Sequence, residues 1–235
     1  MKRITIALVG DFDEKISTLV ALNQSVEHCR SQLPFALDCE WVPTDHVDKI
    51  FSQPEKYNGI WIVPGSPYKN DAGVYEVIRT AREKNIPING SCGGFQYMIL
   101  EYAKNVLQIT NVGHEENEPD TVHIISKLHC SLKGQEELVN ITDRNSWLYH
   151  VLKTDTIIGR YYCSYGLNPV YRERLNNFPF VFTAVSPTGE VRAFELRNHR
   201  FFKGTLFQPS LDSSPDKPNP LIVSFFKACA ADVIS

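Results

Sequence analysis

The 235-residue sequence contains no long hydrophobic run, no block of like charges, no low-complexity segment and no internal repeat. A membrane-spanning helix needs about 20 apolar residues, which no stretch approaches. The apolar run that follows Lys2 and Arg3 is interrupted by Asp11 and Asp13, so it is too short for the core of a signal peptide. We therefore expect a cytoplasmic protein with no membrane partner.

An excess of positive charge is also missing. The chain has 24 Lys and Arg against 27 Asp and Glu, for a formal net charge of −3. Proteins that bind nucleic acids usually carry a basic patch or stripe, and no such segment is present. We expect no nucleic-acid partner.

Metal and disulfide motifs are absent too. The six cysteines form no Cys-x-x-Cys pair, and no histidine pair has a zinc spacing. The glycine-rich motif of P-loop nucleotide-binding proteins does not occur. We expect no metal and no cofactor, and most cysteines are expected to be small buried side chains.

Alternating strand and helix patterns dominate the first half. Apolar runs predict strands at residues 4–9, 35–41, 59–63 and 86–88, and helical spacing predicts helices at 15–30, 73–84 and 95–103. This alternation indicates a parallel sheet in an α/β fold, and the length suits one domain over residues 1–235. Further strands are predicted at 122–126, 157–162, 180–186, 191–195 and 204–207, a turn at 186–189, and a final helix at 221–230.

A cysteine in a glycine-rich turn is the main candidate for chemistry. Residues 90–94 read Gly-Ser-Cys-Gly-Gly and join a predicted strand to a predicted helix. Such a turn can expose Cys92 as a nucleophile, and the helix N-terminus favours its thiolate. The backbone N–H groups of Gly93 and of Gly65, which follows another strand, could stabilise an oxyanion. The alternative is an inert cysteine buried in a tight turn.

Several segments resemble the class I glutamine amidotransferases, and most closely the C-terminal glutaminase domain of CTP synthase. They include residues 59–65 (Gly-Ile-Trp-Ile-Val-Pro-Gly), 90–96 (Gly-Ser-Cys-Gly-Gly-Phe-Gln), 165–169 and 206–209. The resemblance implies a flavodoxin-like fold, with a mostly parallel central sheet flanked by helices and a small added antiparallel portion. A branch of stand-alone relatives of that C-terminal region shares the Leu-Phe-Gln-Pro segment at 206–209.

The resemblance also implies roles for individual residues. Cys92 matches the nucleophile that forms a γ-glutamyl thioester, and Gly65 and Gly93 match the oxyanion-binding amides. Gln96 matches a residue lining the glutamine pocket, and Glu116 matches the carboxylate that holds the substrate's amino group. The alternative for Glu116 is a solvated acidic loop that includes Glu115 and Glu118.

Four positions depart from the family pattern. Gln208 stands in place of the catalytic histidine, and Ser210 in place of the carboxylate that orients it. Ser164 replaces an arginine expected to bind the substrate's carboxylate, and Ser66 replaces a second glycine in the oxyanion loop. A glutamine amide cannot exchange a proton near pH 7, so ordinary glutaminase activity is doubtful.

Two residues are candidates to replace the missing catalytic groups. His114 could serve as a base for Cys92, or it could be an exposed loop residue. Cys163 could lie beside Cys92 as a second thiol, or it could pack against the sheet.

Three hypotheses follow. The first is a cysteine-dependent hydrolase or acyl transferase without the usual triad, acting on a small, amino-acid-like substrate. The second is an inactive pseudo-glutaminase that binds a small ligand or a partner, such as a separate synthetase subunit. The third is a thiol redox protein. We do not expect a complete CTP synthase, because the P-loop motif of its synthetase region does not occur in these 235 residues.

Overall fold

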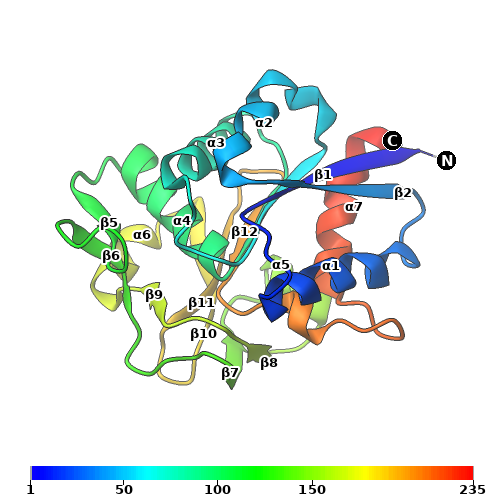
Figure 1. The fold of residues 1–235 in the computed structure, drawn as a ribbon. Coiled ribbons are helices and arrows are strands. Elements are labelled where there is room, and N and C mark those ends of the chain that lie inside the picture. Colours follow the sequence, from blue (N-terminus) through cyan, green and yellow to red (C-terminus); the bar gives the residue numbers. More distant parts are fainter. Residues whose placement is uncertain (1, 235) are drawn as a thin grey trace.

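The computed structural model describes residues 2–234, and a central sheet of nine strands organises them. The strands follow one another in the order β2-β1-β3-β4-β12-β11-β10-β7-β8. Helices cover this sheet, as Figure 1 shows, and a separate small sheet of three strands lies at one side. The α/β fold expected from the alternating pattern is confirmed.

One half of the sheet is parallel. It consists of β2 (Ala36–Val42), β1 (Arg3–Val9), β3 (Gly59–Ile62), β4 (Ile88–Ser91) and β12 (Phe202–Thr205). All four residues of β3 and of β4 are buried, as expected for strands covered on both faces. β4 begins two residues later than the predicted strand, because residues 88–91 are held by pairing with β3 and β12 despite their weak strand propensity.

The other half is antiparallel and larger than expected. It contains β11 (Val191–Leu196), β10 (Phe180–Val185), β7 (Glu136–Ile141) and β8 (Thr156–Arg160), joined through four antiparallel pairings. The turn predicted at residues 186–189 connects β10 to β11, with Gly189 at a φ of 89°. The sheet is therefore evenly mixed among the described strands, rather than mostly parallel.

Neighbouring residues of β3 show how the helices are distributed. Trp61 packs against Phe225 and Phe226 of α7 (Pro220–Ile234), whereas Ile62 lies against Gly94 of α4 (Gly93–Glu101). Since successive strand residues point to opposite faces, α7 and α4 cover opposite sides of the sheet. In Figure 1, α1 (Ser17–Arg30) lies near α7, and α3 (Asp71–Glu83) lies near α4.

The remaining elements are short. They are η1 (Thr44–His46), α2 (Asp48–Ser52), η2 (Pro54–Lys56), the π-helical η3 (Tyr102–Val106), β5 (Val112–His114), β6 (Val122–Lys127), α5 (Trp147–Leu152), β9 (Tyr165–Leu167), η4 (Pro169–Tyr171), α6 (Arg172–Leu175) and η5 (Pro209–Asp212). β5, β6 and β9 form the small sheet. None of the helices within residues 2–234 has the length and apolar character needed to cross a membrane.

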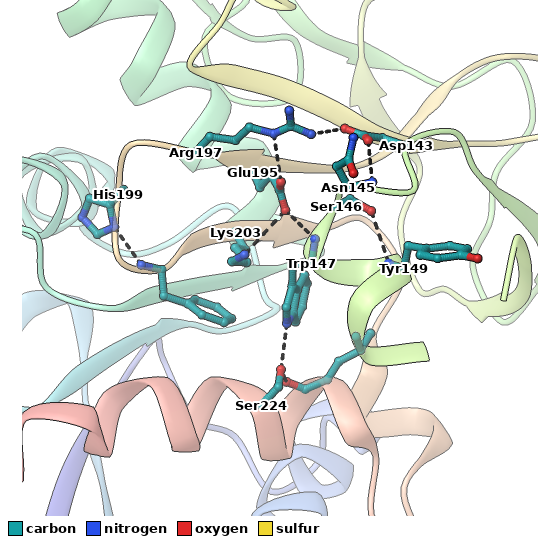
Figure 2. Close-up of polar contacts among 12 residues, drawn as sticks. Asp143, Asn145, Ser146, Trp147, Tyr149, Glu195, Arg197, His199, Lys203 and Ser224 are labelled. Carbon is teal, nitrogen blue, oxygen red and sulfur yellow. Dashed lines mark hydrogen bonds and ion pairs between the residues drawn. The ribbon is translucent and has the colours of Figure 1, made fainter. Parts of the chain in front are cut away.

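A buried polar cluster ties α5 to the antiparallel half of the sheet (Figure 2). Glu195 of β11 accepts a hydrogen bond from the backbone N–H of Trp147 at 2.8 Å, and its carboxylate also contacts Arg197 and Lys203. The indole of Trp147 donates to Ser224 Oγ of α7 at 2.7 Å. The cluster therefore links three elements that are distant in the sequence.

Candidate active site

Cys92 occupies a strained turn between β4 and α4. Its φ of 55° and ψ of −109° are unusual for a residue with a side chain. The helix that follows runs very close to β3, since a Cβ on Gly94 would lie 2.1 Å from the carbonyl oxygen of Ile62. Glycine is required at this position, and the tight turn it permits presents the cysteine at the ends of the parallel strands.

A cavity of about 390 Å³ lies at this edge of the sheet. Its wall includes the first turn of α1, the loop 64–66 after β3, Cys92, Gln96, Glu116, the segment 162–165 and Gln208. Cys92 is 6% exposed and lies at this wall. Open α/β sheets bind their ligands at the carboxyl ends of the strands, so this is the candidate active site.

The surroundings of Cys92 favour its thiolate. Its pKa is lowered first by interaction with the Cys163 thiol, and then by hydrogen bonds from the Gly93 amide and the Gln208 side chain. Burial and the Glu116 carboxylate act in the opposite direction. The pKa of Cys163 is raised well above its ordinary value by the same interaction and by burial. Cys92 is therefore the thiol that ionises, and Cys163 is the one that keeps its proton.

Other cysteines show the contrast. Burial raises the pKa of both Cys29 and Cys39 to about 12, and it raises that of Cys229 well above its ordinary value. All six cysteines are free, and no group of three or more potential metal ligands occurs between residues 2 and 234.

The two amides expected to form an oxyanion hole lie on adjacent segments. Gly65 has a φ of 124°, which strongly favours glycine, and it lines the cavity. A Cβ on Gly93 would lie 2.7 Å from Ser66 Oγ, so the loop after β3 packs directly against the turn at Cys92. The structure thus brings Gly65, Ser66 and Gly93 together with the cysteine.

Gln96 is held by three hydrogen bonds. Its Oε1 accepts from Ser66 Oγ at 3.2 Å and lies 3.2 Å from His114 Nε2, while its Nε2 donates to the carbonyl of Tyr165 at 2.8 Å. The Nδ1 atom of His114 accepts from the Glu116 N–H at 3.1 Å, so Nε2 carries the proton. Burial lowers the pKa of His114 to about 4.

His114 therefore matches neither alternative drawn from the sequence. It is only 1% exposed, and both of its ring nitrogens are engaged by groups other than the thiol. Its contacts support the wall of the pocket, and they leave no ring nitrogen available to Cys92.

The three glutamates of the nearby loop have different environments. Glu115 accepts from the Lys127 N–H at 2.6 Å, and Glu118 binds Lys104 at 2.9 Å. Glu116 lines the cavity instead, and burial raises the pKa of its carboxyl group while Lys133 lowers it. Glu116 is thus distinct from its acidic neighbours, as its position in the sequence suggested.

Two lysines that the sequence did not single out also line the cavity. Lys15 precedes the first turn of α1, and Lys133 lies in the loop before β7. Ser164, at the arginine position, faces Ser131 with their Oγ atoms 2.8 Å apart. Lys15 lies in the loop between β1 and α1, so the strand-end rule could have identified it, whereas no sequence signal marks Lys133.

The two residues at the missing triad positions are both buried. Gln208 is 1% and Ser210 is 4% exposed. Within the described part of the chain, Gln208 Oε1 and Ser210 Oγ have no hydrogen-bond partner. The Gln208 amide lowers the pKa of Cys92, but it cannot carry a proton away.

Comparisons with known proteins agree with this geometry. The family described as glutamine amidotransferase class-I matches residues 19–228. The CTP synthase of Sulfolobus acidocaldarius is 29% identical, covering 98% of this chain and 46% of that protein. The CTP synthase of Geobacillus kaustophilus is 28% identical, covering 97% of this chain and 45% of that protein. The chain thus spans about half the length of the curated relatives it matches.

A solved structure is similar over nearly the whole chain. The glutaminase domain of the Trypanosoma brucei CTP synthase with bound acivicin has a TM-score of 0.88 and 26% identity, covering 97% of this chain and 94% of that one. A glutamine amidotransferase from Thermotoga maritima has a TM-score of 0.59 at 10% identity, covering 99% of this chain and 98% of that one. The second likeness concerns the fold alone.

Proposed function

The chain belongs to the class I glutamine amidotransferases and is related to the glutaminase domain of CTP synthase, and on that premise we propose that it is a cysteine-dependent acyl transferase or hydrolase. The observation that carries the proposal is the environment of Cys92. Its thiolate is favoured by three neighbouring groups in a cavity lined by Gly65, and Gly93, the second candidate oxyanion residue, directly follows Cys92. A cysteine whose pKa is lowered depends less on a histidine to remove its proton, because a larger fraction of it is thiolate.

The charges of the cavity support a small amino-acid-like substrate. Glu116 is placed to bind a substrate's ammonium group, and Lys133 and Lys15 supply positive charge near Ser164, where the family arginine is missing. A lysine ammonium can bind a carboxylate as a point charge, without the paired hydrogen bonds of an arginine. We therefore assign carboxylate binding to Lys133, which also lies close enough to lower the pKa of Glu116.

The missing base restricts the leaving group. The Cys92 sulfur attacks the carbonyl carbon, and the oxygen becomes an oxyanion held by the Gly65 and Gly93 amides. A thiolate or a stabilised alkoxide then leaves with its bonding electrons, whereas an amine would need a proton from a general acid. Water or another acceptor attacks the resulting thioester and releases the Cys92 thiolate. Esters and thioesters fit these residues better than glutamine does.

One observation favours a second candidate. Gln208 occupies the position of the base and is buried without an ionisable neighbour at Ser210, which suits a pseudo-glutaminase that binds a ligand but does not turn it over. In that case Cys92→Ala should retain ligand binding. A binding role also fits a separate partner, since the matched CTP synthases are about twice as long as this chain. We place either function in the cytoplasm, where free thiols persist.

The pH dependence of Cys92 alkylation tests the proposal. Iodoacetamide labelling, located by peptide mass, should give an apparent pKa for Cys92 below the ordinary value of about 8.5 for a free thiol. The exposed Cys130 provides the reference within the same molecule. A Cys92 that labels more slowly than Cys130 across the pH range would favour the pseudo-glutaminase.

Restoring the triad tests whether the pocket accepts glutamine. The double variant Gln208→His with Ser210→Glu replaces the missing base and its carboxylate partner. We expect ammonia release from glutamine to rise by about 10²-fold or more, since general acid–base catalysis contributes 10²–10⁴-fold. The same double variant carrying Cys92→Ala is the control and should be inactive. A folded double variant without glutaminase activity would exclude glutamine as a ligand in the reactive orientation.

A further inference from the structure

Cys163 is a second buried thiol in the wall of the cavity, and the acyl-transfer reaction does not use it. Cys92 and Cys163 each have 6% of their surface exposed, and both line the same cavity. The Cys92 Sγ lies 3.9 Å from the carbonyl oxygen of Tyr162, the residue just before Cys163. Both thiols therefore belong to the same part of the cavity wall, and interaction between them lowers the pKa of Cys92 and raises that of Cys163. Cys163 follows Cys92 by 71 positions in the sequence, and the fold brings them together.

The pair is chemically asymmetric. Cys92 lies in a strained turn at a helix N-terminus, and the Gly93 amide and the Gln208 side chain lower its pKa. Cys163 lies in the segment before β9 and stays protonated beside it. An accessible thiolate with a neighbouring protonated thiol is the arrangement in which one cysteine attacks an oxidant and the second resolves the product.

We propose that Cys92 and Cys163 form a nucleophile and resolving pair that reduces small hydroperoxides, with a dithiol as the reductant. This activity goes beyond acyl transfer, because it requires both sulfur atoms and no carbonyl substrate. A hydroperoxide is small enough for the 390 Å³ cavity, and the lowered pKa of Cys92 increases the fraction of thiolate that can attack it without a base.

The reaction balances in three steps. The Cys92 thiolate attacks the terminal oxygen of the hydroperoxide, so that an S–O bond forms and the O–O bond breaks. The alkoxide leaves, takes a proton from solvent and becomes an alcohol, and Cys92 is oxidised to a sulfenic acid. The Cys163 sulfur then attacks the Cys92 sulfur, which forms the disulfide and releases water containing the Cys163 proton. A dithiol reduces this disulfide and is itself oxidised to a disulfide.

The cavity contains groups suited to the departing oxygen. The Gly65 and Gly93 amides, which lie beside the thiol, can donate hydrogen bonds to an alkoxide as they would to an oxyanion.

Cys130 offers the matched comparison in this chain, because it is exposed and free but does not line the cavity. Exposure alone would make Cys130 the more reactive thiol, whereas the proposal makes it Cys92.

A single-turnover experiment on the full chain tests the proposal. The reduced protein is mixed with one equivalent of hydrogen peroxide, with a metal chelator present, quenched by alkylation and digested without reduction. We expect a disulfide-linked peptide pair containing Cys92 and Cys163, formed at least about tenfold faster than oxidation of Cys130, because the rate follows the thiolate fraction. Cys130→Ala should behave as the unaltered protein does. Cumene hydroperoxide should react in the same way.

Variants separate the two steps. With Cys163→Ala or Cys163→Ser, the sulfenic acid on Cys92 should persist and be trapped by dimedone, and no disulfide should form. With Cys92→Ala, peroxide consumption in the presence of excess dithiothreitol should fall to the rate without protein. The proposal is overturned if Cys130 is oxidised before Cys92, or if Cys92 becomes a sulfenic acid that Cys163 does not resolve.

Discussion

His114 illustrates how burial and hydrogen bonding determine the state of a single residue. Its Nδ1 accepts from the Glu116 amide, its Nε2 donates to Gln96, and burial lowers its pKa to about 4. The carboxylates of Glu118 and Glu115 oppose this shift, and His123 adds to it. The neutral ring is therefore part of the folded structure, and protonating it removes the acceptor for the Glu116 amide.

This residue should make the stability depend on pH. Its folded pKa of about 4 lies below the ordinary value of 6.5, so the unfolded state binds the proton more readily between these values. The stabilisation that the neutral His114 ring contributes to the folded state is complete above about pH 6.5 and is lost as the pH falls toward 4. Between pH 7 and 5 we expect a loss of about 2 kcal/mol in the free energy of unfolding from this group.

Urea denaturation of the protein and of His114→Gln at both pH values measures this effect. The difference in pH dependence between the two proteins isolates the contribution of His114. Glu116 is present in both proteins, and its raised pKa gives each the same contribution of opposite sign. Equal pH dependence in the two proteins would contradict the prediction.

At the scale of elements, the Glu195 cluster shown in Figure 2 is what holds α5 in place. The Glu195 carboxylate caps the start of α5 through the Trp147 N–H and neutralises Lys203, whose pKa is lowered by burial. Lys203 also lies 5.5 Å from the ring centroid of Trp147. One carboxylate therefore joins β11, β12 and α5.

Removing this carboxylate should be costly. We expect Glu195→Ala to lower the free energy of unfolding by about 3 kcal/mol, since breaking a buried ion pair leaves an uncompensated charge. Asp155→Ala is the matched control, because Asp155 pairs with Arg144 at 2.8 Å but both side chains are more than half exposed. Its effect should be small. Urea midpoints for the two variants test this, and similar losses would contradict it.

At the scale of the whole molecule, the active site lies in the parallel half of the sheet, and the antiparallel half supports it. Cys92 follows β4, and Gln208 follows β12, which pairs with β4 in parallel from Ile88 to Ser91. β4 is entirely buried, whereas β8 at the far edge exposes Ile158 by 53%. Stability should therefore decrease from the centre of the sheet toward β8.

Native-state hydrogen exchange tests this gradient. Amides of β3 and β4 should exchange only through global unfolding, while those of β8 should exchange through local opening at a lower free energy. Mass spectrometry of peptic peptides resolves these strands. A β8 peptide as strongly protected as the β4 peptide would show that the sheet unfolds as one unit.

Most of the fold could be predicted from the sequence, because the period of the apolar residues reports burial directly. The strands at residues 4–9 and 59–63 and the helix at 73–84 were identified in this way, and each agrees with the structure to within two residues. The strands β5 and β9 could not be identified, since three residues carry no readable period. Their position depends on pairing with β6.

The α/β class, the glycine-rich turn at Cys92 and the absence of histidine at position 208 can be read from the amino-acid sequence, because each depends on local chemistry. Which side chains meet in the cavity depends on the tertiary structure. It placed Cys163 and Lys133 beside the turn and Glu116 at the wall, and it engaged both ring nitrogens of His114 elsewhere. The reason is that ionisation depends on burial and on neighbours brought together by folding, and neither is encoded in a residue's immediate sequence context.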